Sequence, residues 1–209
     1  MLGECKKLGL STSAELISSR IASLPETLRE FEVLRDAVQF EMENKLFLFI
    51  PQHLAIYYEW EGIVSDTVID AFPKSYQEIR AAGSCFAAGL YTACVFHSMR
   101  AAEIGLKSLG SEYNIKIKGE KSIELAEWRE ILDGLNTAIQ DIENLPNATK
   151  DKEKRLQFCS EAAAQFRFFK NGWRIRTAHA RATYNEPQAK EAIDHVRSFF
   201  ETLATNLHE

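Results

Sequence analysis

The chain has 209 residues, of which 45% are hydrophobic and 26% charged, and its formal net charge at pH 7 is −5. A chain of this length can bury a sizeable core. The negative charge argues against a protein whose surface is covered by nucleic acid, because many cations would be needed to neutralise the phosphates. The four cysteines are scattered, without a C-x-x-C pair or a histidine at zinc-ligand spacing, so we expect free thiols and no metal site.

The N-terminal sequence lacks the charged, apolar and small-residue regions of a signal peptide. The longest apolar runs, such as residues 46–51, are too short to cross a bilayer. The sequence therefore predicts a soluble, cytoplasmic protein without a membrane partner. It contains no glycine-rich phosphate loop, nucleophile elbow or Ser/His/Asp arrangement, so no cofactor is expected.

Helical spacing dominates the N-terminal section, and strand-like alternation is nearly absent. Ser13 could cap a first helix, and a second runs from about Pro25 to Lys45. Residues 46–51 then form either a short strand or an extended link into a helix over about 53–61. The second helix carries one apolar stripe, made of Leu28, Phe31, Leu34, Val38 and Met42.

From residue 74 to residue 109 the spacing predicts two helices, with a turn near Gly89 and Thr92 as a cap for the second helix. The second helix is apolar over most of its circumference, which is typical of a central, buried helix. Ser122 opens the cleanest amphipathic helix, the charged run 151–155 is the solvated start of the next one, and the last helix starts near residues 185–187.

Short loops between long amphipathic helices predict an all-α fold, an up-and-down bundle with an N-terminal helical extension. We place the boundary at Pro73. Residues 1–72 are expected to form a helical section packed on the bundle, and residues 73–209 are expected to form the bundle itself.

One segment of this acidic chain is strongly basic, because no Asp or Glu occurs between Ala162 and Asn185. On a helix Arg167, Lys170 and Arg174 share one face, and a positive cluster of this kind suits a phosphate. A solvated basic face on an amphipathic helix is the alternative interpretation. The cationic and imidazole side chains of the segment are Arg167, Lys170, Arg174, Arg176, His179 and Arg181.

Residues 170–179, Lys-Asn-Gly-Trp-Arg-Ile-Arg-Thr-Ala-His, resemble the motif of the HEPN family, an Arg followed after four to six residues by a His. The stretches 90–107 and 184–199 resemble a group of uncharacterised bacterial proteins with this type of domain. Together with the bundle, the resemblance covers roughly Pro73 to the C-terminus.

The resemblance implies a metal-independent endoribonuclease, often a toxin or a phage-defence component, in which a homodimer brings two motif copies to one cleft. An antitoxin or a defence-system protein is then a possible partner, and RNA the substrate. Arg174 would hold the scissile phosphate, and His179 would transfer a proton. Their cooperation requires a helix end or turn between them. Further substrate contacts are expected from Lys170, Asn171, Arg176 and Arg181.

Three other residues are candidates for supporting roles. Arg100 and Glu103 are expected to form a buried ion pair, or to line the cleft and orient Arg174. Tyr184 could flank the cleft or simply pack. Many family members have a polar residue, commonly Asn, directly after the motif Arg, whereas this chain has Ile175. That difference favours the alternative function, a catalytically inactive HEPN-like module that dimerises or binds RNA, a nucleotide or a partner protein.

Overall fold

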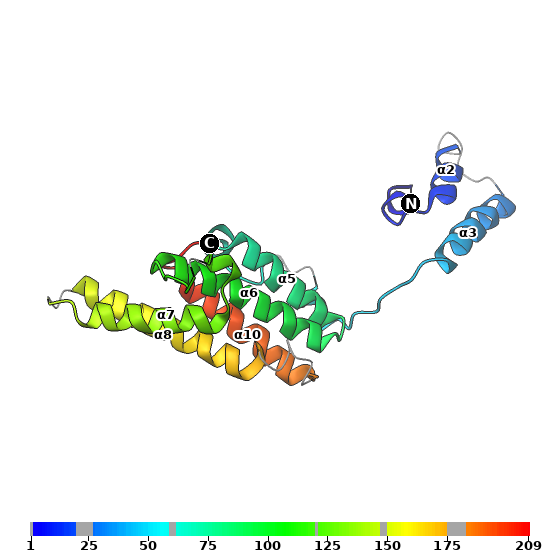
Figure 1. Ribbon diagram of the computed structural model, residues 1–209. Coiled ribbons are helices and arrows are strands. Elements are labelled where there is room, and N and C mark those ends of the chain that lie inside the picture. The colour runs from blue at the N-terminus through cyan, green and yellow to red at the C-terminus, as the bar shows by residue number, and fades with distance from the viewer. Residues whose placement is uncertain (1, 20–26, 59–61, 120, 147–149, 175–182) are drawn as a thin grey trace. The chain divides into compact units, whose positions relative to one another are not determined.

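The structure is a computed structural model that describes residues 2–19, 27–58, 62–119, 121–146, 150–174 and 183–209 (Figure 1). Within these ranges the chain is helical with irregular connections and contains no strand, which confirms the predicted all-α class. None of the helices in these ranges is long and apolar enough to cross a membrane. The chain divides into two compact units, residues 1–49 and 50–209.

The first unit consists of α1 (Leu2–Lys7), α2 (Ser11–Ser19) and α3 (Leu28–Glu43) around a small core of Cys5, Leu10 and Ala14. The Thr27 hydroxyl accepts a hydrogen bond from the Glu30 N–H and caps α3, so the expected second helix begins two to three residues later than Pro25.

Two expectations for this unit change. Ser13 is not a cap: it lies inside α2, buried, and its hydroxyl donates to the Glu41 carboxylate on α3. The predicted apolar stripe of α3 is only partly used, because Leu34 is buried while Leu28 and Phe31 are exposed.

Residues 46–50 adopt neither helix nor strand, so they form the link that was one of the two alternatives. They lead into a short 3₁₀ helix, η1 (Ala55–Tyr57), and then to α4 (Asp66–Ala71). The described part of the expected helix over 53–61 is therefore a single 3₁₀ turn.

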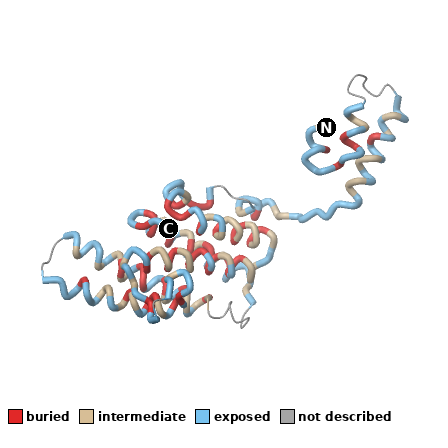
Figure 2. Tube along the Cα trace, turned by 45° about the horizontal axis from the view of Figure 1, so that its top comes forward, coloured by how far each residue is buried: buried red, intermediate tan, exposed pale blue. Residues whose placement is uncertain are grey.

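The units divide at residues 49 and 50 rather than at Pro73, because residues 50–72 contribute to the core of the second unit. Leu54, Ile63, Val64, Val68 and Phe72 are all buried in that core (Figure 2). The carboxylate of Glu201 on the last helix accepts hydrogen bonds from the Ser65 N–H and hydroxyl at 2.8 and 2.6 Å, which ties the start of α4 to the C-terminal end of the chain. Whether the first unit packs on the bundle stays a prediction.

The bundle is arranged around α6 (Tyr91–Glu112), which contacts α5, α7, α8 and α10. Its ten buried residues lie on one half of its circumference, so the nearly all-round burial that its apolar sequence predicts is only partly realised. Gly105 allows α10 to approach closely, because a Cβ at this position would lie 3.1 Å from the Phe200 ring. The other helices of the bundle are α5 (Pro73–Ala87), α7 (Trp128–Glu143), α8 (Lys150–Phe169) and α10 (Glu186–Leu203).

The helix starts depend on particular side chains. Asn185 and Gln188 form a reciprocal capping box at the start of α10. Ser122 caps only the 3₁₀ helix η2 (Ile123–Leu125), and α7 begins at Trp128, three residues after η2 ends. Thr92 does not cap α6: it lies within the helix, and its hydroxyl accepts a hydrogen bond from the Tyr184 N–H at 3.1 Å. This bond attaches the chain just before α10 to the start of α6.

Two truncations test where the stable unit begins. We expect residues 50–209 alone to keep the thermal midpoint of the bundle. A chain beginning at Pro73 lacks several buried side chains, each worth about 2–5 kcal/mol, so its unfolding free energy should fall by more than about 4 kcal/mol. Circular dichroism during thermal and urea unfolding measures both. Equal stability of the two truncated chains would contradict the observed boundary.

Candidate functional site

Arg174 lies at the end of a π-helical turn, η3 (Lys170–Arg174), that follows α8. This turn is anchored by Trp173, which is buried, stacks on Phe169 and meets the His195 ring edge-on. The Tyr184 hydroxyl donates to the Trp173 carbonyl at 3.4 Å. The backbone at Arg174 is therefore fixed by the core, while its own side chain remains 34% exposed.

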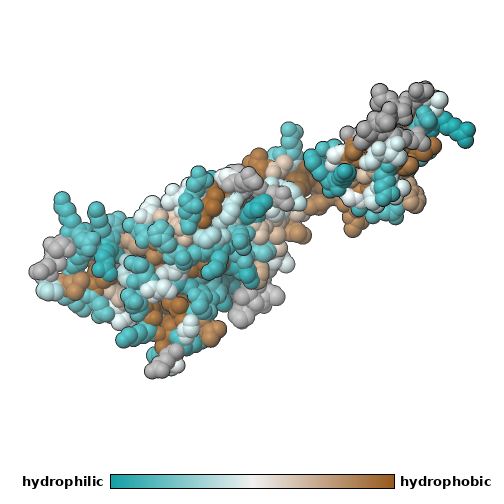
Figure 3. All heavy atoms as spheres, turned by 90° about the horizontal axis from the view of Figure 1, so that it is seen from above, coloured by the Kyte–Doolittle hydropathy of each residue, from teal (hydrophilic) through white to brown (hydrophobic). Residues whose placement is uncertain are grey.

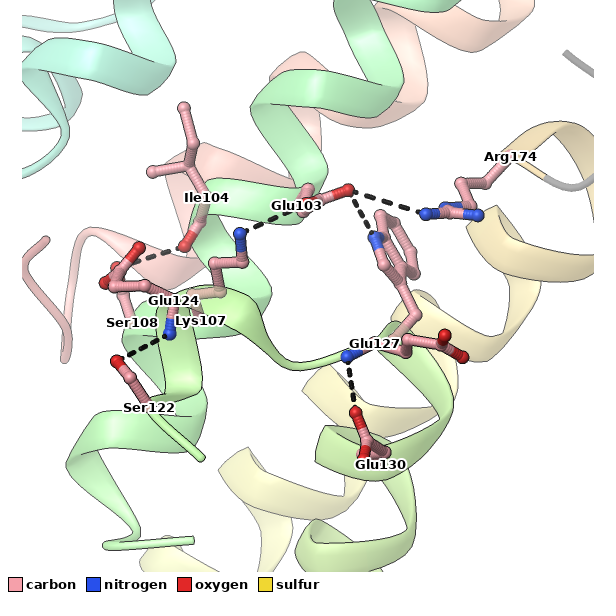
Figure 4. Close-up of polar contacts among 10 residues, drawn as sticks. Glu103, Ile104, Lys107, Ser108, Ser122, Glu124, Glu127, Glu130 and Arg174 are labelled. Atoms are coloured by element: carbon pink, nitrogen blue, oxygen red, sulfur yellow. Dashed lines mark hydrogen bonds and ion pairs between the residues drawn. The ribbon is translucent and has the colours of Figure 1, made fainter. Parts of the chain in front are cut away.

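The Arg174 guanidinium points toward two residues on other helices (Figure 4). A guanidinium nitrogen lies 3.8 Å from the Glu103 carboxylate on α6, which is an ion-pair distance rather than a hydrogen bond. The guanidinium carbon lies 5.8 Å from the ring centroid of Trp128 at the start of α7, within cation–π range. Three elements, η3, α6 and α7, thus position this side chain.

Glu103 is the centre of this polar group. Its carboxylate accepts a hydrogen bond from the Trp128 indole N–H at 2.9 Å and pairs with the Lys107 ammonium at 3.1 Å. Burial of the carboxyl acts to raise its pKa, but the hydrogen bonds from Trp128 and Lys107 and the charges of Lys107 and Arg174 outweigh this effect and lower the pKa. Glu103 is consequently ionised at neutral pH.

Arg100 does not pair with Glu103, contrary to the expected ion pair. Its guanidinium donates to Glu78 on α5 at 2.8–2.9 Å, and the same carboxylate lies 2.8 Å from Nδ1 of His97. The Glu78 side chain is only 17% exposed, and its burial acts to raise the pKa of the carboxyl. The hydrogen bonds from Arg100 and His97 outweigh this effect, so the pKa is lowered. Glu78 comes from a helix whose register with α6 the sequence does not reveal, so sequence reasoning missed it.

A pocket of about 330 Å³ lies over the one open side of α6. Its charged lining comprises three cations against one carboxylate, so it favours an anion. The charged residues are Arg100, Glu103, Lys107 and Arg174, and the apolar ones are Phe96, Met99 and Ile104. Phe96 and Lys107 were not predicted, although the spacing of 96, 100, 103 and 107 puts all four positions on one helix face.

A larger groove of about 660 Å³ lies between α8 and α10. It is lined by apolar side chains such as Phe158, Phe199 and Leu203, and by the acidic residues Glu161 and Asp194, without any Lys or Arg. Its chemistry does not suit a phosphate, so the pocket beside Arg174 is the better candidate for an anion site. In the space-filling view, hydrophilic side chains cover much of the visible face of the second unit, with hydrophobic patches between them (Figure 3).

The remaining predicted site residues divide between described and undescribed parts of the chain. Lys170 is half-buried and Asn171 exposed, both within η3. His179, Arg176 and Arg181 lie outside the described residues, and so does the turn required between Arg174 and His179. The part of the basic cluster that can be placed is therefore Lys170 and Arg174 in η3, together with Arg167 on α8, whose guanidinium donates to the Asn136 side chain on α7.

The thiols and carboxylates show no further constellation in the described part of the chain. All four cysteines are free, and burial raises the pKa of the Cys94 thiol to about 12, which makes it a poor nucleophile. No group of three or more His, Cys, Asp or Glu residues that could hold a metal ion occurs among the described residues.

Comparison with models of known protein families, with curated proteins and with solved structures found no significant match to this chain. Functional inference therefore rests on the chemistry of the site and on the motif residues themselves.

The lowered pKa of Glu103 predicts a particular dependence of stability on pH. The charged carboxylate contributes stability above its ordinary pKa near 4.5, and this contribution is lost as pH falls through the lowered value. Glu103→Gln has no carboxyl to titrate. The loss of unfolding free energy between pH 7 and pH 3, measured by urea unfolding, should therefore be smaller in this variant than in the native protein.

Glu191→Gln, on the exposed side of α10, is the matched control for removal of one carboxylate. If Glu103→Gln and Glu191→Gln change the pH dependence equally, the pairing of Glu103 with Trp128 and Lys107 has no energetic importance.

Proposed function

We propose that this protein is a HEPN-like ribonuclease that cleaves RNA without a metal ion and holds the reacting phosphate with Arg174. The observation that carries the proposal is the placement of Arg174 at the wall of a cation-lined pocket, where Glu103 and Trp128 hold its guanidinium. An arginine remains charged throughout the physiological pH range and presents a fork of donors that matches phosphate oxygens.

The pocket adds two further cations to Arg174. Arg100 and Lys107 line the same space, and each is already attached to a carboxylate on one side, Arg100 to Glu78 and Lys107 to Glu103. Side chains held in this way lose less conformational entropy when a ligand binds than unattached ones would. A phosphodiester in the pocket would therefore meet preorganised positive charge, which can stabilise the charge that develops on phosphorus oxygens during cleavage.

In the proposed reaction the RNA 2′-oxygen attacks the neighbouring phosphorus, and the bond from phosphorus to the 5′-oxygen breaks. One imidazole takes the 2′-hydroxyl proton and another gives a proton to the leaving 5′-oxygen. His179 is the motif imidazole, and a homodimer would supply the second copy. Such an enzyme would act as a cytoplasmic toxin or defence component held in check by a partner protein.

The first prediction concerns binding. Arg174→Ala should weaken RNA affinity by about 10- to 100-fold, the value of a hydrogen bond to a charged group, and should reduce the slope of log affinity against log salt by about 1. Arg174→Lys should recover only part of the affinity, because a lysine lacks the planar fork.

Arg129→Ala is the matched control for this experiment, since Arg129 is an exposed arginine of α7 that pairs with Asp133 outside the pocket. Fluorescence anisotropy with labelled RNA measures all three variants. Equal affinities of Arg174→Ala and Arg129→Ala would contradict a phosphate site at Arg174.

The second prediction concerns cleavage. His179→Ala should lower the cleavage rate by about 100- to 10,000-fold while RNA affinity stays near that of the native protein, because the imidazole transfers protons and the guanidinium binds. Cleavage by the native protein should survive a chelator and leave a 2′,3′-cyclic phosphate, detected by mass spectrometry of the products. Full cleavage by His179→Ala would exclude the proposed role of this residue.

A non-cleaving RNA-binding module is the second candidate function. It is favoured by Ile175, which cannot hydrogen-bond a substrate at the position that follows the motif arginine. The same assays separate the two: a module would lose affinity on Arg174→Ala yet leave RNA intact under every condition.

A further inference from the structure

An exposed aromatic ring lies in the pocket beside Arg174. Phe96 is 45% exposed, although the residues next to it on α6, Val95 and Met99, are buried. Its position is one turn before Arg100 and two turns before Glu103, so it belongs to the same open helix face as the charged lining. A phenylalanine at this position contributes little to the core, and its exposed ring is open to a ligand.

The ring is placed next to positive charge. The Arg100 guanidinium carbon lies 6.0 Å from the Phe96 centroid, at the limit of a cation–π contact, and Glu78 holds the guanidinium from the other side. Met99 and Ile104 extend the apolar part of the same pocket. One pocket thus offers a flat apolar surface together with cations, the two features that a nucleotide needs for its base and its phosphate.

From these contacts we infer that the pocket binds one unpaired nucleotide of an RNA single strand, with its base stacked on Phe96 and a phosphate between Arg100 and Arg174. This inference rests on the proposed function and specifies its substrate class. Phe96 and Glu103, the residue beside Arg174, are seven residues apart on α6. This spacing is about 10 Å along the helix axis and separates the base site from the phosphate site on the same side of one helix.

The size and shape of the pocket favour a single strand over a duplex. A volume of about 330 Å³ is at the small end of ligand pockets and holds one nucleotide rather than stacked base pairs. In a duplex the face of each base is covered by its neighbours, so a base can reach Phe96 only when it is unstacked. Phe96 should therefore contribute to affinity for single strands and contribute little to affinity for duplexes.

The test compares Phe96→Ala and Phe96→Trp in binding a short, labelled 2′-O-methyl oligoadenylate. The methyl group blocks the attacking oxygen, so binding is measured without cleavage. Phe96→Ala should weaken affinity about tenfold, the usual effect of removing one stacking aromatic, while Phe96→Trp should keep or increase it. Affinity for a duplex of the same length should change less than twofold in either variant.

Leu145→Ala is the control for removal of an exposed apolar side chain, since Leu145 is 50% exposed just beyond the end of α7 that lies away from Trp128. Circular dichroism checks that each variant is folded, and Phe96→Trp keeps the test informative if Phe96→Ala does not fold. If Phe96→Ala binds like the native protein while Arg174→Ala does not, the stacking site is refuted and the proposed phosphate site stands. If neither variant changes affinity, both are refuted.

Discussion

The structure of the second unit depends on the burial of α6. Four helices pack on it, and residues such as Val95, Met99 and Leu106 are shielded from water as a result. The other half of the helix is more open, and Arg100, Glu103 and Lys107 lie there because a buried, unpaired charge would cost several kcal/mol. This half is also where α5, α7 and η3 approach from both sides. A pocket with side chains from several helices is a direct consequence of this packing.

Within that pocket the two arginines are held by partners on other helices, whereas Lys107 pairs with Glu103 one turn away on α6. Arg174 is held by α6 and α7, and Arg100 by α5. Glu103 has two opposing effects on an anion site: it orients Arg174 and Lys107, and it cancels part of their charge. Its distance of 3.8 Å from Arg174, against 2.9 Å from Trp128, means that a phosphate can compete for the arginine without breaking the tighter bond. In the proposed function, Arg174 would exchange a carboxylate contact for a phosphate at small structural cost.

Sequence patterns predicted the elements much better than the contacts between them. All-round apolarity identified α6 as the central helix, and Asn185 was correctly placed at the start of α10, because both depend on local spacing. The boundary at Pro73 failed because Ser65 is tied to Glu201, 136 residues away, and a contact of this kind leaves no local signal. The same reason explains why Arg100 was paired with Glu103 on its own helix instead of with Glu78. The candidate site was half predicted: Arg174 and Glu103 are brought together, while the importance of Phe96 and Lys107 follows only from the pocket.

The importance of the residue directly after the motif arginine depends on which other residues orient that arginine. A polar residue there would orient the guanidinium from its own backbone segment, and Ile175 cannot do so. In this chain Glu103 supplies an ion pair and Trp128 an aromatic face from two other helices, so the orientation does not require a polar residue at 175. Tyr184, just before α10, is attached to both η3 and α6, because its hydroxyl donates to the Trp173 carbonyl and its N–H donates to the Thr92 hydroxyl. In the proposed function, the phosphate would contact Arg174, which the bundle holds, whereas proton transfer is assigned to His179, outside the described residues. An isoleucine at position 175 is therefore compatible with the proposed phosphate contact of Arg174.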